Sequence, residues 1–303
     1  NGNTDLYRTF GGTPAYGKSD SYGVSGVLEY EFSEAAVLKS TTAWRGVELE
    51  SSTDNDGTPY WFSGGLPPVA GNRINQDQFS QELQLSGKSG QLQYIVGGFY
   101  FVENGTDRSD SGSLFPLSPS VASVDGTVKN RSTAAYGQLI YNLTDAVRLT
   151  GGLRYTDDKR DMVLRNKDRN VLTNVVTSSL GTVADGLLDG DANDQLRATL
   201  ELKFNYLSYL VSADWQASDD VFVYIKTSRS QRSGGLNTRA VTGGVPPVSF
   251  VPEVVTDYEV GTKIDLLDRR VRMNLAAFNS NIDDVQRNVI GAVGTRLVSG
   301  VAN

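Results

Sequence analysis

Apolar and polar residues alternate along much of the chain with a period of two, which is typical of β-strands with one apolar face. The alternation is clearest over 258–266, where Glu259 and Val260 begin two opposite faces. Further strands are predicted at about 24–32, 37–49, 79–85, 91–103, 133–143, 147–155, 206–216, 221–229 and 270–279, and over 91–103 and 221–229 both faces carry apolar residues. The pattern predicts an all-β chain of about ten strands, without amphipathic helices.

Short and long connections alternate between these predicted strands. The short connections cover 33–36, 86–90, 144–146, 217–220 and 267–269, and the long polar ones cover about 50–77, 104–131, 158–195 and 230–253. Consecutive connections of an antiparallel meander lie at opposite ends, so all short turns share one rim and all long loops share the other. Outer-membrane barrels follow this rule, with short periplasmic turns and long extracellular loops, whereas a soluble sandwich has no reason to keep it.

Aromatic residues stand close to several of the short connections. Tyr30, Phe32, Tyr141 and Trp215 each lie a few positions or less before a short turn, on the apolar side of their strands. Such positions suit an interfacial girdle, in which the ring lies in the lipid headgroup layer. The strands that end at 85 and 266 lack the aromatic residue, so the pattern is partial.

Composition excludes several classes of protein. Hydrophobic residues make up 39% of the chain, and no apolar run approaches the roughly 18 residues that a spanning helix needs. The chain contains no His and no Cys, which excludes most metal centres, disulfide frameworks and Ser-His-Asp catalysis. A net charge of −7 without a basic stripe argues against a nucleic-acid partner. We therefore expect no enzyme activity, no catalytic residue, no metal site and no cofactor.

The length of 303 residues is itself informative. At roughly 27 residues for each strand with its connection, a plugged transporter barrel of about 22 strands would need about 600 residues. The sequence therefore predicts an antiparallel up-and-down transmembrane β-barrel segment, an open half of such a barrel, with unpaired edges near 24–32 and 270–279. Neither end of the chain looks like a natural terminus, so we expect a single partial barrel domain over 1–303.

Seven segments carry a family resemblance in order and spacing. They are Phe79-Ser-Gln-Glu-Leu-Gln-Leu85, Gly97-Gly-Phe-Tyr-Phe101, Thr150-Gly-Gly-Leu-Arg-Tyr-Thr-Asp157, Ser233-Gly-Gly-Leu-Asn237, Phe250-Val-Pro-Glu253, Tyr258-Glu-Val-Gly-Thr-Lys263 and Ala277-Phe278 to Gln286. Together they resemble the barrel of the TonB-dependent outer-membrane receptors.

The resemblance implies an active-uptake receptor in the bacterial outer membrane for a scarce, large ligand, either a ferric siderophore or an oligosaccharide. It implies as partners the lipid bilayer, the ligand and an inner-membrane TonB complex that acts through a plug domain. The plug and the final barrel strands of the family have no counterpart in this sequence.

Two groups of residues are candidates for sites. The charged residues on the polar sides of the strands are expected to face the lumen and to form a charge lattice there, rather than to bind ligand: Glu82, Arg148, Arg154, Glu259 and Lys263. Tyr60, Trp61 and Phe62, in the long connection 50–77, are ligand candidates because exposed rings suit stacking on sugars or flat chelates. Packing of that loop on itself is the competing explanation for these three rings.

Two other functions remain open at this point. A passive porin or a structural barrel would share the membrane but lack energy coupling. A soluble carbohydrate-binding β protein would use the long loops as its binding end. The soluble protein requires an apolar interior and a polar exterior, whereas the membrane barrel reverses the two.

Overall fold

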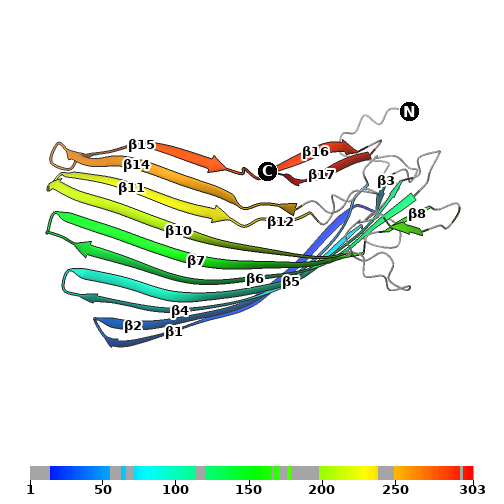
Figure 1. Cartoon of the computed structure of the whole chain (residues 1–303), viewed down its shortest axis with the longest axis horizontal. Helices are drawn as coiled ribbons and strands as arrows, with labels where there is room; N and C mark the ends of the chain where they lie inside the picture. The colour runs from blue at the N-terminus through cyan, green and yellow to red at the C-terminus, as the bar shows by residue number, and fades with distance from the viewer. Residues whose placement is uncertain are drawn as a thin grey trace.

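The computed structural model describes residues 14–54, 63–65, 71–113, 120–165, 167–170, 173, 176–178, 198–237, 249–293 and 296–302. Every regular element in these ranges is a strand (Figure 1). Ten long strands form one sheet: β1 (Tyr16–Ser33), β2 (Ala36–Ser52), β4 (Asn72–Ser89), β5 (Leu92–Ser113), β6 (Ser120–Asn142), β7 (Val147–Leu164), β10 (Ala198–Ser218), β11 (Val221–Arg232), β14 (Glu253–Leu266) and β15 (Val271–Asp283).

Seven shorter strands accompany this sheet. They are β3 (Ser63–Gly65), β8 (Lys167–Asn170), β9 (Val176–Ser178), β12 (Gly235–Leu236), β13 (Ser249–Phe250), β16 (Arg287–Val293) and β17 (Arg296–Ala302). β3 pairs with β5, and β8 pairs with β6 and β9. β12 pairs with β13 and β16 pairs with β17, each pair as a separate antiparallel sheet.

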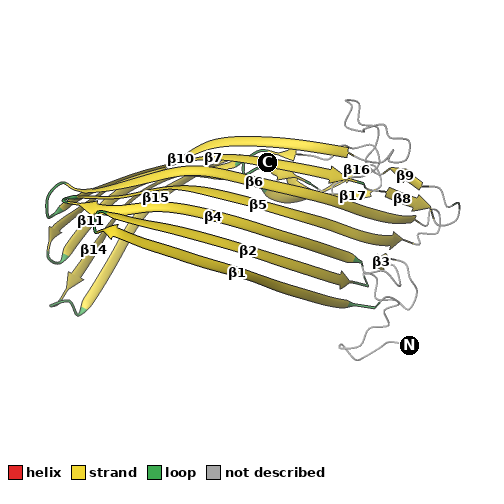
Figure 2. Ribbon diagram, turned by 90° about the horizontal axis from the view of Figure 1, so that it is seen from below, coloured by secondary structure: helices red, strands yellow, loops and turns green. Residues whose placement is uncertain are grey.

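The main sheet is an antiparallel meander, because each long strand pairs with the next long strand along the chain. The sheet is curled and open, with β1 and β15 at its edges (Figures 1 and 2). The turns between consecutive strands of each hairpin gather at one end of the sheet in both views. The predicted fold class and the placement of all short turns at one rim are thus confirmed.

The prediction of long loops is wrong over much of their length, because strands extend into them. β4 already begins at Asn72, β5 continues to Ser113, β6 starts at Ser120 and β7 runs on to Leu164. The sequence prediction ended each strand where the apolar alternation stopped. Ladder hydrogen bonds do not depend on side-chain polarity, so the strands continue with polar residues on both faces.

Pairing register divides the side chains of the sheet into two faces. Glu82, Arg154, Lys226 and Glu259 share one face, which we call the polar face. The other, called the apolar face, carries Leu28, Leu83, Leu139, Leu153, Val211, Ile225 and Val260. Register also assigns the ambiguous strands, since Val96 and Tyr100 of β5 and Ile225 of β11 lie on the apolar face.

Burial on the two faces is the reverse of that in a soluble protein. Leu153 and Leu83 are 58% and 51% exposed, and the buried hydrophobic residues of the described part of the chain are only Ala134, Met162 and Leu164. On β7 the polar-face residues Thr156 and Asp158 are each 2% exposed. This arrangement excludes the soluble alternative, which needs a dry apolar centre. Among the described residues, no helix is long and apolar enough to cross a membrane.

Two sets of aromatic residues delimit the apolar face. The predicted girdle residues Tyr30, Phe32, Tyr141 and Trp215 all lie on this face, near the short turns, and are exposed. A second set, not predicted from the sequence, is exposed farther along the strands: Tyr22, Trp44, Tyr100, Tyr155 and Tyr258. Along β1, Tyr22 and Tyr30 are eight positions apart, about 26 Å along the strand, which suits the roughly 9–11 residues with which a tilted strand crosses a bilayer.

A polar cluster lies on the apolar face beside the second aromatic set. Gln81 donates to the Oγ of Ser40 at 2.9 Å and accepts from the Oγ1 of Thr42 at 2.5 Å. These cross-strand bonds satisfy the side chain within the apolar band, where an unpaired amide would be costly. The Gln81 that broke the sequence alternation therefore does not change the assignment of β4.

Candidate functional site

The five charged residues singled out in the sequence share the polar face but do not pair with one another. Arg148 binds Asp214 at 2.6 Å, and the guanidinium of Arg154 lies over the rings of Phe99 and Tyr136. Lys263 lies over the ring of Phe222, with its Nζ 5.7 Å from the ring centroid. The face is therefore a network of charge, hydroxyl and aromatic contacts, not a simple lattice of opposite charges.

Both glutamates accept a hydrogen bond from a tyrosine that covers a glycine. The hydroxyl of Tyr136 donates to Glu82 at 2.7 Å, and its ring lies over Gly97 on the neighbouring strand. In the same way Tyr224 donates to Glu259 and lies over Gly261. Lys226 adds an ion pair to Glu259 at 2.8 Å. One oxygen of Glu82 and both oxygens of Glu259 are thus bonded to side chains of neighbouring strands, which agrees with the predicted structural role of these carboxylates in the wall of the sheet.

A cavity of about 430 Å³ lies on the polar face, on the side of the sheet far from the short turns. We call it the mouth cavity. Its lining comprises Phe101, Glu103, Val128, Asn130, Arg160, Asp161, Met162, Gly234, Gly235, Leu236 and Phe250. The wall of the cavity thus comes from β5, β6 and β7, and its cover comes from the short strands β12 and β13.

A small apolar core holds the cover of the mouth cavity in place. Met162 and Leu164 are buried, and Val128, Leu200 and Leu236 pack against them. Gly234 allows the close approach, since a Cβ there would lie 2.4 Å from the carbonyl oxygen of Phe250 and 2.7 Å from the ring of Phe204. The Ser233-Gly-Gly235 segment therefore packs tightly against the wall, which its sequence alone did not reveal.

The side chain of Gln286 joins the backbone positions that flank the covering strands β12 and β13. The Nε2 of Gln286 donates to the carbonyl oxygens of Ser233 and Val251, each at 3.0 Å. The backbone N–H of Gln286 donates to Glu253 at 2.7 Å. Asn237 is held separately, because its side-chain amide pairs with both backbone groups of Val301 at 2.9 and 2.8 Å. A single glutamine between two strands has no recognisable sequence signal, so these hydrogen bonds of Gln286 could not be predicted.

Replacing Gln286 by Ala is expected to loosen the cover of the mouth cavity. The change removes two hydrogen bonds to backbone carbonyls, each worth about 1 kcal/mol. Hydrogen exchange should therefore become roughly thirtyfold faster at the amides of 234–237 and 249–251. Asn281→Ala, on the exposed edge strand β15, is the matched control and should change nothing there. Unchanged hydrogen exchange in Gln286→Ala would show that the Gln286 hydrogen bonds do not hold the covering strands β12 and β13.

The aromatic candidates Tyr60, Trp61 and Phe62 lie outside the described residues. In the structure, four other residues line the mouth cavity: Phe101, Asn130, Arg160 and Phe250. They were not predicted as site residues, because they are far apart in the chain and fall in predicted loops or at the borders of those loops. Within the described ranges, no group of three or more acidic residues is arranged to hold a metal ion.

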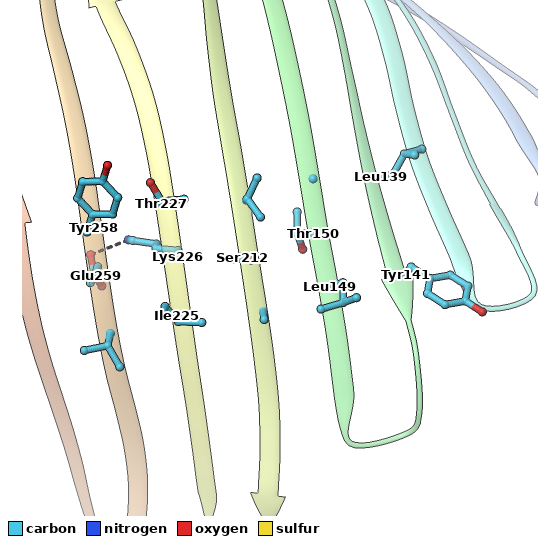
Figure 3. Close-up of a pocket in the computed structure, with 14 residues that line it drawn as sticks. Leu139, Tyr141, Leu149, Thr150, Ser212, Ile225, Lys226, Thr227, Tyr258 and Glu259 are labelled. Carbon is cyan, nitrogen blue, oxygen red and sulfur yellow. Dashed lines mark ion pairs between the residues drawn. The ribbon is translucent and has the colours of Figure 1, made fainter.

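A second and larger hollow, of about 730 Å³, lies on the apolar face (Figure 3). Its side walls include Leu139, Tyr141, Leu149, Ile225 and Tyr258. The ion pair between Lys226 and Glu259, which is dashed in Figure 3, belongs to the polar face of the same strands. The hollow has almost no polar lining, and it lies between the two aromatic sets.

Comparison with known proteins identifies relatives of the whole sheet. The model of the family "TonB dependent receptor-like, beta-barrel" matches residues 1–299. The pesticin receptor of Yersinia enterocolitica is 27% identical over 237 residues, which is 78% of this chain and 31% of that protein. The pesticin receptor of Yersinia pestis is 26% identical over 74% of this chain and 29% of that protein.

Solved structures show the same fold. The ferric yersiniabactin uptake receptor FyuA from Yersinia pestis superposes with a TM-score of 0.65 at 21% identity, over 88% of this chain and 36% of that one. The siderophore receptor PiuA from Acinetobacter baumannii gives a TM-score of 0.59 at 15% identity, over 87% of this chain and 40% of that one. The chain thus spans about a third of the length of the relatives it matches.

Proposed function

Because the chain belongs to the TonB-dependent receptor family, we propose that it forms part of the wall of a receptor that actively takes up a scarce, large ligand. Family members are outer-membrane β-barrels and not enzymes, so the chain is an outer-membrane protein. In the proposed receptor the apolar face contacts the lipid bilayer and the polar face lines the lumen, where Glu82, Arg148, Arg154, Glu259 and Lys263 point. We also propose that residues 1–303 form one partial barrel domain.

The position of the mouth cavity is the observation that carries this proposal. Short turns of outer-membrane barrels lie in the periplasm, so the opposite end of the sheet opens to the outside. The cavity lies on the polar face at that end, under a segment held by Gln286. A wall with a covered polar recess at its outer end suits the capture of a ligand before transport, which an open passive porin does not require.

For the ligand we favour the ferric siderophore class over oligosaccharides. FyuA is a ferric yersiniabactin uptake receptor and PiuA is a siderophore receptor by name. Transport would draw energy from the inner-membrane TonB complex through the plug of the complete receptor. Tyr60, Trp61 and Phe62 remain candidates for further ligand contacts in the outer loops.

Uptake assays on cells that carry the gene of the complete receptor test this function. Deleting that gene should abolish growth on one or more ferric siderophores under iron limitation, and deleting the TonB gene should have the same effect. A general porin gene, deleted in parallel, is the control and should leave siderophore use unchanged. Persistent receptor-dependent uptake without TonB would instead favour the passive porin, and growth defects only on oligosaccharides would move the ligand to the glycan class.

A further inference from the structure

Three polar residues that line the mouth cavity, Glu103, Asn130 and Arg160, belong to one cross-strand row, and the fourth, Asp161, is paired with Arg131 and Lys159. Gln78, Glu103, Asn130 and Arg160 occupy neighbouring positions on β4, β5, β6 and β7. The carboxylate of Glu103 accepts from three amides, those of Gln76 at 2.5 Å, Gln78 at 2.7 Å and Asn130 at 2.7 Å. Because both carboxylate oxygens are already bonded, Glu103 is a fixed part of the wall and has little capacity left for a ligand.

Arg160 is the cationic group of this row, and it retains most of its donors. Among the described residues its guanidinium contacts one acidic group, Asp158, at 3.5 Å, and its side chain is 22% exposed. Tyr206 also donates to the same Asp158 oxygen, at 3.2 Å. A guanidinium has five N–H donors in a planar fork, and one long contact leaves most of them open to the cavity. An anionic oxygen in the cavity would supply the missing acceptor.

The remaining walls favour a flat ring. Phe101 of β5 and Phe250 of β13 line the cavity from different elements, and the thioether of Met162 lies in the same wall. Aromatic faces and a methionine sulfur both pack well against a planar π-system. The volume of about 430 Å³ falls at the lower end of the range for small-molecule sites, roughly 300–1,000 Å³, and suits one arm of a large cargo.

We propose, as a refinement that rests on the proposed uptake function, that the mouth cavity is a subsite for an aryl arm of the cargo that carries a phenolate or carboxylate oxygen. Arg160 binds that oxygen through two N–H groups, and Phe101 and Phe250 contact the ring. The subsite thereby selects cargo by the charge and planarity of one arm, independently of how the metal is held elsewhere.

Binding of salicylate to the complete receptor in detergent tests the subsite. Salicylate provides the ring, the phenol oxygen and the carboxylate, and ligand-observed NMR should detect it with a Kd of about 1 mM, the weak affinity expected of so small a probe. Cyclohexanecarboxylate, which is anionic but not flat, and benzyl alcohol, which is flat but neutral, should bind at least tenfold more weakly.

Variants locate the binding. Arg160→Gln and Phe101→Leu should each weaken salicylate binding at least fivefold, whereas Arg229→Gln, which makes the same charge change on the apolar face of β11, should leave it unchanged. Equal binding by Arg160→Gln and the unaltered receptor, or equal binding of cyclohexanecarboxylate and salicylate, would overturn the subsite. Loss of salicylate binding with intact siderophore uptake refutes only the subsite, and intact salicylate binding without any TonB-dependent uptake refutes only the proposed function.

Discussion

Val260→Arg is expected to destabilise the folded receptor in membranes by about 2 kcal/mol, because it places a charge in the apolar band. Val260 is 49% exposed on the apolar face, two residues from Tyr258 and six from Leu266 at the short turn. Costs for Arg reach about 2–4 kcal/mol at the bilayer midplane and decrease toward the interfaces. Denaturant titration of the receptor folded into lipid vesicles, with heat-resistant gel mobility as the indicator of folding, measures the loss.

Leu149→Arg, on the same face of β7, should cost less, about 0–1 kcal/mol, because Leu149 pairs directly with the girdle residue Tyr141 near the short turn. Lys263→Ala is the control on the polar face of the strand that carries Val260, and it should cost little because it removes a single cation–π contact with the Phe222 ring. If Val260→Arg inserted and unfolded like the unaltered receptor, the apolar face would not face lipid, and the inside-out assignment would be wrong.

Gly97→Ala is expected to destabilise the sheet by about 2–4 kcal/mol. A Cβ at position 97 would lie 2.6 Å from the Tyr136 ring and 2.9 Å from the carbonyl oxygen of Leu83, so the ring must move. That movement breaks the bond from Tyr136 to the carboxylate of Glu82, and hydrogen bonds to charged groups contribute roughly 1.5–3 kcal/mol. It also removes Tyr136 from beneath the guanidinium of Arg154. The same denaturant titration gives the free energy of unfolding.

Gly151→Ala is the matched control, because a Cβ there would meet nothing within 4 Å. This substitution should change the free energy of unfolding by less than about 0.5 kcal/mol. A double-mutant cycle then isolates the ring. With Tyr136 already replaced by Ala, Gly97→Ala should cost clearly less, and an unchanged cost in that background would assign the effect to the backbone of Leu83 instead.

Alternation was enough to predict the strands that cross the apolar band. In β14, Val260 and Glu259 were assigned to opposite faces from sequence, and the register confirms that division. In β5 the sequence could not decide, because Ile95 and Val96 are equally apolar. There the pairing of β5 with β4 and β6 determines the faces, and this pairing joins residues that lie far apart in the sequence.

The mouth cavity could not be predicted for a related reason. Phe101 was assigned to a strand and Phe250 to a loop, and 149 positions separate them in the chain. They line the same cavity, whose cover is held by Gln286, from a third segment, through the backbone of Ser233 and Val251. Each of these contacts spans a different and large sequence separation, so no window of the sequence contains the site.

The lengths of β5 and β6 have a kinetic consequence. These strands contain 22 and 23 residues, whereas a tilted strand crosses a bilayer in about 9–11, so roughly half of this hairpin rises above the lipid as a regular wall. Inside a closed barrel, a molecule that has entered such a tall vestibule can leave only along its axis. It will collide with the walls many times before it escapes, and each collision is another chance to be recaptured. In the proposed receptor, height alone would therefore lengthen the residence of the cargo, even where every individual contact is weak.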